Sequence, residues 1–186
     1  FIANNTRPDE VVFDMVAPYT NGKTTGWMKK ISFLGNHKFL IPANLLLIAF
    51  FIYLKKHKDA LLVTVVALSS LGLMSLLKNL VQRYRPSSPL VDGITNFSFP
   101  SGHALMSVAF YGLLSFYAIK MITNPVIRVS ILLLLFAITL LIGFSRIYLR
   151  VHYTTDVIAG FSIGVCWMLF CFWLLNKNAK PGNQGL

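Results

Sequence analysis

Residues 126–144 read VIRVSILLLLFAITLLIGF, a run of 19 residues in which Arg128 is the only charged side chain. A helix rises about 1.5 Å per residue, so this run can cross the ~30 Å hydrocarbon core of a bilayer. The run is continuous rather than alternating, which favours a helix over a strand. Arg128 lies near its start and can extend toward the headgroups. Residues 126–144 therefore predict a transmembrane helix.

Four similar runs lie elsewhere in the chain, which has 186 residues, 55% of them hydrophobic and only 12% charged. An average soluble domain is about 25% charged. This composition excludes a disordered tail and an ordinary water-soluble globule. We expect one all-α domain, a polytopic transmembrane helical bundle with about five spans. The other four runs are Phe39–Leu54, Ala60–Leu77, Ala104–Met121 and Val157–Leu175.

Residues 1–38 are mixed in polarity and predict short interfacial helices. Thr6 and Asp9 have the spacing of a helix start, and Thr24 or Thr25 can cap a second helix that ends near Gly35. Trp27 and its neighbouring lysines suit a membrane interface. The chain begins at Phe1 without an initiator methionine, and we expect a further, N-terminal span or a signal peptide to be missing upstream.

The net charge is +11, and the 17 Lys and Arg side chains divide between the two ends of the predicted bundle. The first end holds seven cations in short connections and the tail: Lys55, Lys56, Lys58, Lys120, Arg128, Lys177 and Lys180. The other ten cations lie in residues 1–38, 78–103 and 145–156, at the opposite end. The raw count favours the second end as cytoplasmic, whereas the density of positive charge favours the first, and the rule that sets orientation concerns short loops near span ends. We therefore expect the first end to be cytoplasmic and the second to be extracytoplasmic.

Three polar segments fall at helix ends on the predicted extracytoplasmic side. They read KNLVQRYRP at 78–86, FPSGH at 99–103 and SRIYLRVHYTTD at 145–156. Lys78, Arg85 and Arg146 supply enough positive charge to hold a phosphate dianion and its transition state. Ser101 and Gly102 begin a predicted helix, whose free N–H groups attract anions.

The two histidines of these segments suit phosphoryl transfer. His152 and Asp156 are four residues apart, so we expect them on one face of a helix start. An aspartate that accepts from one imidazole nitrogen leaves the other nitrogen free to attack. His103 then remains as a titratable group that can protonate a leaving oxygen.

The three segments together resemble the signature of the type 2 phosphatidic acid phosphatase family, the integral-membrane lipid phosphate phosphatases. The resemblance covers roughly Phe39 to Leu175. It implies that His152 is the nucleophile that forms a phosphohistidine, that Asp156 orients it, and that His103 is the general acid and base. It also implies that the remaining signature residues bind the phosphoryl group: Lys78, Arg85, Ser101, Gly102 and Arg146. Members typically have six spans, which agrees with a missing N-terminal one.

The resemblance implies a metal-independent phosphatase, with no cofactor, that hydrolyses a lipid phosphomonoester or diphosphate, and the charge distribution predicts that its site lies at the extracytoplasmic face. We expect an extracytoplasmic interfacial segment at 1–38, a transmembrane phosphatase domain at 39–175 and a cytoplasmic tail at 176–186. Arg83 and Arg150 lie outside the signature and are possible headgroup contacts or interfacial cations. The lipid stays open among phosphatidylglycerol phosphate, phosphatidic acid, a polyprenyl diphosphate and a lipid A phosphate.

Two other functions fit the same residues. A lipid phosphotransferase would pass the phosphoryl group from His152 to an acceptor other than water. A non-catalytic membrane protein could use the same cations to bind anionic lipid. Nucleic acid is disfavoured as a partner because no stretch combines dense basic charge with aromatic residues. Cys166 and Cys171 are read as small apolar side chains, and the sequence leaves the oligomeric state undefined.

Overall fold

The fold is described from a computed structural model, which describes residues 7–177. It is all-helical, as predicted. The helices are α1 Arg7–Val16, the short 3₁₀ helix η1 Ala17–Tyr19, α2 Gly22–Phe33, α3 His37–Tyr53, α4 His57–Val81, α5 Gly102–Met121, α6 Pro125–Tyr148 and α7 Thr154–Lys177. Thr6 of the predicted helix start and Lys180 of the predicted tail lie outside the described residues.

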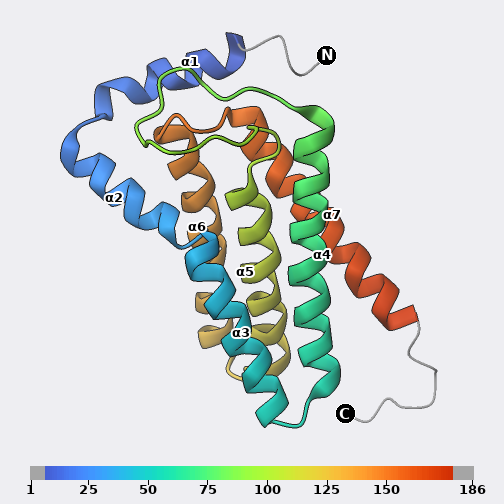
Figure 1. Ribbon diagram of the computed structural model, residues 1–186. Helices are drawn as coiled ribbons and strands as arrows, with labels where there is room; N and C mark the ends of the chain where they lie inside the picture. The colour runs from blue at the N-terminus through green and yellow to red at the C-terminus, as the bar shows by residue number, and fades with distance from the viewer. Residues whose placement is uncertain (1–6, 178–186) are drawn as a thin grey trace.

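Five stretches within residues 7–177 are long and apolar enough to cross a membrane. Four of them are α4, α5, α6 and α7 (to Leu175), and the fifth, Gly22–Tyr53, comprises α2, a turn and α3. The prediction of five spans is thus confirmed, and the protein is an integral membrane protein. In Figure 1, α5 lies at the centre of the bundle, while α1 and the long loop between α4 and α5 lie across one end.

The helix ends follow ordinary capping chemistry. Asn124 accepts hydrogen bonds from the N–H groups of Val126 and Ile127, and Pro125 occupies the first turn of α6. The α2 cap differs from the prediction, because Asn21 rather than Thr24 or Thr25 is the capping residue. Thr24 instead completes a capping box by accepting from the Asn21 N–H.

Close packing between α5 and α7 fixes the geometry of the bundle end at which both helices start. A β-carbon at Gly160 would lie 2.7 Å from the Ser101 carbonyl oxygen and 2.9 Å from Ala104 Cβ. Only glycine therefore allows α7 to approach the start of α5 this closely. The Ser101 N–H donates to the Asp156 carbonyl at 3.0 Å, which ties the two helix starts together.

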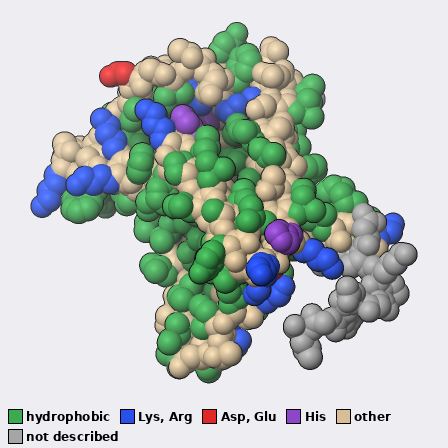
Figure 2. Space-filling model, turned by 60° about the horizontal axis from the view of Figure 1, so that its bottom comes forward, with side chains coloured by type: hydrophobic (Ala, Val, Ile, Leu, Met, Phe, Trp, Pro, Cys, Tyr) green, Lys and Arg blue, Asp and Glu red, His purple; other side chains and the backbone are tan. Residues whose placement is uncertain are grey.

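The polar sequence segments meet at one end of the bundle. The end of α4, the start of α5, the end of α6 and the start of α7 all lie at the end that α1 crosses (Figure 1). The connections α3–α4 and α5–α6 lie at the other end. Figure 2 shows the Lys, Arg and His side chains in separate groups, with hydrophobic side chains over much of the surface between them.

Candidate active site

A cavity of about 800 Å³ opens at this end of the bundle, and five of the predicted site side chains line it. They are Lys78, Arg85, His103, Arg146 and His152, which come from four different parts of the chain. The cavity continues between α3 and α4, where its walls are mainly apolar but include Asn44 and Thr64. These walls include Leu40, Ile41, Leu45, Ile48, Leu68, Leu71 and Met74. A charged chamber thus joins a hydrophobic groove.

His152 and Asp156 form the centre of the site, and both are almost completely buried. The Nδ1 atom of His152 lies 3.6 Å from Oδ2 of Asp156. His152 is not on a helix face as the spacing suggested, since α7 begins only at Thr154. His152 instead lies in the loop directly before the first turn, where the Tyr153 N–H donates to the same Asp156 oxygen at 3.0 Å.

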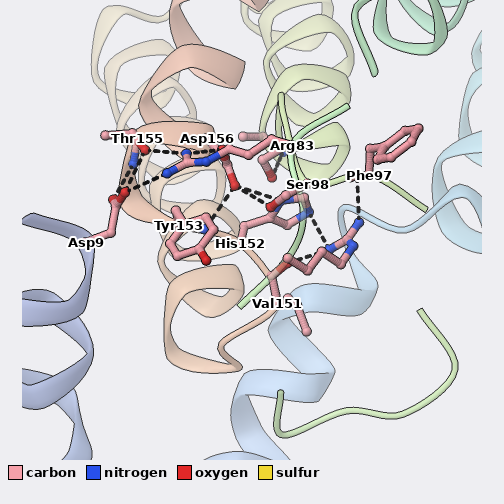
Figure 3. Close-up of polar contacts among 12 residues, drawn as sticks. Asp9, Arg83, Phe97, Ser98, Val151, His152, Tyr153, Thr155 and Asp156 are labelled. Carbon is pink, nitrogen blue, oxygen red and sulfur yellow. Dashed lines mark hydrogen bonds and ion pairs between the residues drawn. The ribbon is translucent and has the colours of Figure 1, made fainter. Parts of the chain in front are cut away.

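Ser98 adds a hydroxyl to this pair. Its Oγ donates to Asp156 Oδ2 at 2.5 Å and lies 3.4 Å from His152 Nδ1 (Figure 3). Ser98 is fully buried. The Asp156 carboxylate is therefore held on the side that faces the imidazole by both a hydroxyl and a backbone N–H.

Arg85 lies against the other nitrogen of His152, with Nη1 3.3 Å from Nε2. A guanidinium can only donate, so Nε2 must present its lone pair and the ring proton belongs on Nδ1. Burial lowers the pKa of His152 to about 3, which leaves the ring neutral near pH 7. Burial also lowers the pKa of Arg85, to about 10, so Arg85 stays charged there. A neutral imidazole thus adjoins a cation.

The carbonyl of Phe97 holds two of the cations. Lys78 Nζ donates to it at 2.5 Å and Arg85 Nη2 at 3.2 Å. Arg85 also donates to the Asn96 carbonyl at 2.7 Å, to the Asn96 side chain at 2.6 Å and to the Val151 carbonyl. The positive groups are therefore oriented by backbone oxygens before any anion binds, which reduces the reorganisation that binding requires.

Arg146 and His103 complete the chamber from the side of α2 and α3. Arg146 is buried, and its Nη1 donates to Ser32 Oγ of α2 at 2.5 Å. His103 contacts the turn before α3, since a β-carbon at Gly35 would lie 3.3 Å from its Cδ2. The Nε2 atom of His103 is buried and has no hydrogen-bond partner within residues 7–177. It is therefore available to a bound ligand.

Ser101 and Gly102 occupy the start of α5. The Ser101 side chain caps the helix by accepting from the Ala104 N–H at 3.5 Å, and it is fully buried. Gly102 lines the cavity, whereas Ser101 is not among the lining residues. Of the two, Gly102 has the better access to a ligand.

Arg83 lies apart from the chamber. It is 3% exposed and is not among the cavity-lining residues. Its Nη1 donates to Asp156 Oδ1 at 2.6 Å, and its Nη2 donates to Asp9 Oδ2 at 3.1 Å. Arg83 was expected to be an interfacial cation or a headgroup contact. It is buried instead, because it forms ion pairs with the carboxylates of Asp9 and Asp156.

Arg150 is also outside the chamber. It adopts a left-handed backbone conformation, and its guanidinium carbon lies 6.0 Å from the centre of the Phe13 ring. It is not among the residues that line the cavity. Arg150 is partly exposed whereas Arg83 is buried, so the expectation of an interfacial cation fits Arg150 better.

The sequence reasoning missed four polar residues that support the site: Asp9, Ser32, Asn96 and Ser98. Ser98 could have been suspected, since it directly precedes the FPSGH segment. Asp9 is one of only six acidic residues in a chain with 17 cations, which made it a candidate partner for a buried cation. Nothing in the local pattern singles out Ser32 or Asn96.

No group of three or more His, Cys, Asp or Glu side chains that could hold a metal ion occurs within residues 7–177. The charged chamber is lined mainly by cations, and Asp92 is the one acidic side chain among the cavity residues described. Such a donor set suits an anion.

The sequence profile of the PAP2 superfamily matches residues 59–180. Phosphatidylglycerophosphatase B of Bacillus subtilis is 34% identical over 152 residues, which cover 80% of this chain and 71% of that protein. Lipid phosphate phosphatase delta of Arabidopsis thaliana is 30% identical over 110 residues, covering 53% of this chain and 26% of that protein.

Two solved structures share the fold. The crystal structure of a transmembrane PAP2-type phosphatidylglycerolphosphate phosphatase from Bacillus subtilis superposes with a TM-score of 0.85 at 28% identity. The match covers 94% of this chain and 88% of that one. LpxE of Aquifex aeolicus superposes with a TM-score of 0.64 at 23% identity, over 87% of this chain and 93% of that one, which is a likeness of fold.

Proposed function

Since the chain belongs to the PAP2 superfamily and is a membrane lipid phosphate phosphatase, we propose that its substrate is phosphatidylglycerophosphate, hydrolysed through a phosphohistidine on His152. Both the relative with 34% identity and the structure with a TM-score of 0.85 are proteins named for that substrate. The other lipids considered from the sequence are alternatives that a direct comparison of rates distinguishes.

The cavity carries this proposal. Its charged chamber fits a terminal phosphomonoester, and the groove between α3 and α4 fits acyl chains that enter from the bilayer. Leu45 and Leu68, which line the groove from opposite helices, are 60% and 66% exposed on the apolar surface. A lipid can therefore keep its chains in the membrane while its headgroup reaches His152.

The first chemical step is attack of His152 Nε2 on phosphorus. The bond between phosphorus and the ester oxygen breaks, and His103 gives a proton to the leaving alkoxide. Lys78, Arg85 and Arg146 neutralise the charge on the phosphoryl oxygens. Asp156 supports the imidazole, which gains positive charge as its Nε2 bonds to phosphorus.

The second step hydrolyses the phosphohistidine. Water attacks phosphorus, His103 takes a proton from that water, and the bond to Nε2 breaks. Inorganic phosphate leaves, and His103 is again protonated for the next cycle. Neither of the two steps requires a metal ion or another cofactor.

The proposed active-site face is extracytoplasmic. The connections at the opposite end carry the cations that favour the cytoplasmic side, as counted from the sequence. Phosphatase activity at this face would act on lipid that has its headgroup in the outer leaflet.

The decisive experiment compares phosphate release from phosphatidylglycerophosphate, phosphatidic acid, a polyprenyl diphosphate and a lipid A phosphate, all in mixed micelles with purified enzyme. The proposal expects the highest kcat/KM for the first lipid. A higher value for any of the others would overturn the substrate assignment.

The phosphotransferase alternative needs its own measurement. Lipid acceptors bearing free hydroxyl groups are added to the same assay, and the products are separated. Phosphate release without phosphorylated acceptor supports hydrolysis. Stoichiometric transfer to an acceptor at the expense of free phosphate would establish the phosphotransferase instead.

A further inference from the structure

The buried Arg83 bridges two carboxylates that come from opposite ends of the sequence (Figure 3). Its Nη1 lies 2.6 Å from Asp156 Oδ1, and its Nη2 lies 3.1 Å from Asp9 Oδ2. Asp9 belongs to α1, Arg83 follows α4, and Asp156 lies in the first turn of α7. All three side chains are at most 2% exposed. We refer to these three residues as the carboxylate bridge.

We propose that Asp9 and Arg83 are positioning residues for phosphoryl transfer, which act on His152 through Asp156. This inference rests on the proposed role of His152 as the nucleophile. Neither residue lines the cavity, so neither touches the substrate.

The first argument is that the two carboxylate oxygens of Asp156 have different partners. Oδ2 faces His152 Nδ1 and accepts from Ser98 and Tyr153. Oδ1 accepts from Arg83, on the side away from the imidazole. Without Arg83, only the contacts of Oδ2 would hold the carboxylate, which would then be less restrained against rotation about its side-chain bonds.

The second argument is the charge of the bridge. Arg83 carries +1 and the two carboxylates −2, so the bridge has a net charge of −1 beside a nucleophile that becomes cationic on attack. If Asp9 lost its charge, Arg83 would cancel Asp156 completely. The developing imidazolium would then lose the net negative charge that stabilises it.

The third argument is the way in which α1 holds Arg83 in place. Asp9 accepts from the Thr155 N–H at 3.0 Å through Oδ1 and from the Thr155 hydroxyl at 2.9 Å through Oδ2. Thr155 also accepts from Arg83 Nη1 at 2.7 Å. The Arg83 guanidinium carbon lies 4.1 Å from the centre of the Tyr153 ring. The guanidinium thus has one defined position, set by α1 and the start of α7.

The test uses Asp9→Asn, which keeps the shape and removes the charge, together with Arg83→Gln and the double variant. The readout is the rate constant for phosphate release in a single turnover with enzyme in excess, which does not depend on the fraction of active enzyme. It is measured with whichever lipid phosphate the wild type hydrolyses, so failure of phosphatidylglycerophosphate as the substrate leaves this test intact.

We expect the rate constant to fall about 10- to 100-fold in each single variant, in Asp9→Asn because the net charge beside His152 is lost and in Arg83→Gln because Oδ1 of Asp156 loses its partner; this is the range found for residues that orient metal ligands. The inhibition constant of inorganic phosphate should stay within about twofold of the wild-type value, because Lys78, Arg85 and Arg146 are unchanged. The double variant should be no slower than Arg83→Gln alone, since Asp9 acts through Arg83.

Two control variants separate positioning from simple stabilisation of the fold. Asp14→Asn removes an exposed charge from the same helix, and Val12→Ala weakens the packing of α1 against the bundle without changing the bridge. Both should keep the wild-type rate constant, even where Val12→Ala melts at a lower temperature. The proposal is overturned if Asp9→Asn and Arg83→Gln also keep the wild-type rate constant. It is equally overturned if the control variants slow the reaction as much as Asp9→Asn does.

Discussion

The Nη1 atom of Arg85 lies 3.3 Å from the Nε2 atom of His152. A phosphoryl group that contacts this guanidinium is therefore within reach of the imidazole lone pair. The short separation means that binding and attack involve neighbouring groups, so small changes in either residue should affect the chemical step rather than binding alone.

Replacing His152 with alanine should reduce phosphate release to the background rate, because no other imidazole nitrogen occupies its position. The protein should still fold, as judged by its elution as a single species in detergent. His57→Ala, at the opposite end of α4, is the matched control and should keep full activity. Normal hydrolysis by the His152 variant would refute the assignment of the nucleophile.

Replacing Arg85 with lysine should lower kcat/KM about 10- to 100-fold. Lysine keeps the charge but loses the planar fork that donates to Asn96, Phe97 and Val151 while facing His152. Steady-state kinetics in mixed micelles measures the loss. Arg128→Lys, at the other end of the bundle, should leave kcat/KM unchanged, and an equal loss in both variants would contradict the role of Arg85.

His152 should stay neutral throughout the range in which most histidines titrate. Burial lowers its pKa to about 3. Nitrogen NMR of histidine-labelled protein, with the His152 signal assigned by its loss in His152→Asn, should show no titration of this ring between pH 5 and pH 8. A titration midpoint near 6.5 would be inconsistent with the buried environment.

The same shift makes a prediction for stability. The unfolded chain, in which His152 has its ordinary pKa, binds more protons than the folded chain between pH 3 and pH 6.5. The contribution of His152 is therefore complete above pH 6.5 and is lost as the pH falls toward 3. The melting temperature should therefore fall less between pH 6.5 and pH 3 in His152→Asn than in the wild type.

The groove between α3 and α4 should be the path of the acyl chains. Leu68→Trp narrows it and should raise the KM for long-chain phosphatidylglycerophosphate several-fold. The rate with a water-soluble phosphomonoester should change little. Leu133→Trp, on an exposed apolar position of α6 that does not line the cavity, is the control. Equal effects of both substitutions would argue against entry through the groove.

The orientation in the membrane can be tested with a cysteine at position 92, which lies in the loop at the active-site end. The exposed Cys166 is first replaced by serine, whereas Cys171 is buried. A membrane-impermeant reagent should label intact cells through this cysteine. Labelling only after the cytoplasmic side is opened would reverse the orientation.

The sequence alone was enough to predict the helical bundle and to predict that the polar segments gather at one of its ends. Continuous apolar runs such as 126–144 leave few alternatives to transmembrane helices, and their alternation places 78–86, 99–103 and 145–156 at one end. Burial and hydrogen bonding could not be read in this way. Arg83 differs from Arg85 only in what surrounds it, and its partner Asp9 is 74 residues away.

Local geometry was also beyond the sequence. The four-residue spacing of His152 and Asp156 suggested one helical face, whereas His152 lies in the loop just before α7 and contacts Asp156 in its first turn. Ser32 meets Arg146 only because α2 packs against α6, which depends on the tertiary arrangement. Interactions of this kind require the packed structure.

The loop from α4 to α5 is anchored at points that bracket its middle section. The Leu90 N–H donates to the Leu149 carbonyl at 2.9 Å, and the Ser98 N–H donates to the Arg83 carbonyl at 2.7 Å. Residues 91–95 lie between these anchors and line the cavity mouth, away from the bonds that hold Lys78 and Arg85. Mutational drift in this short section can therefore alter headgroup preference while the reaction machinery is inherited intact.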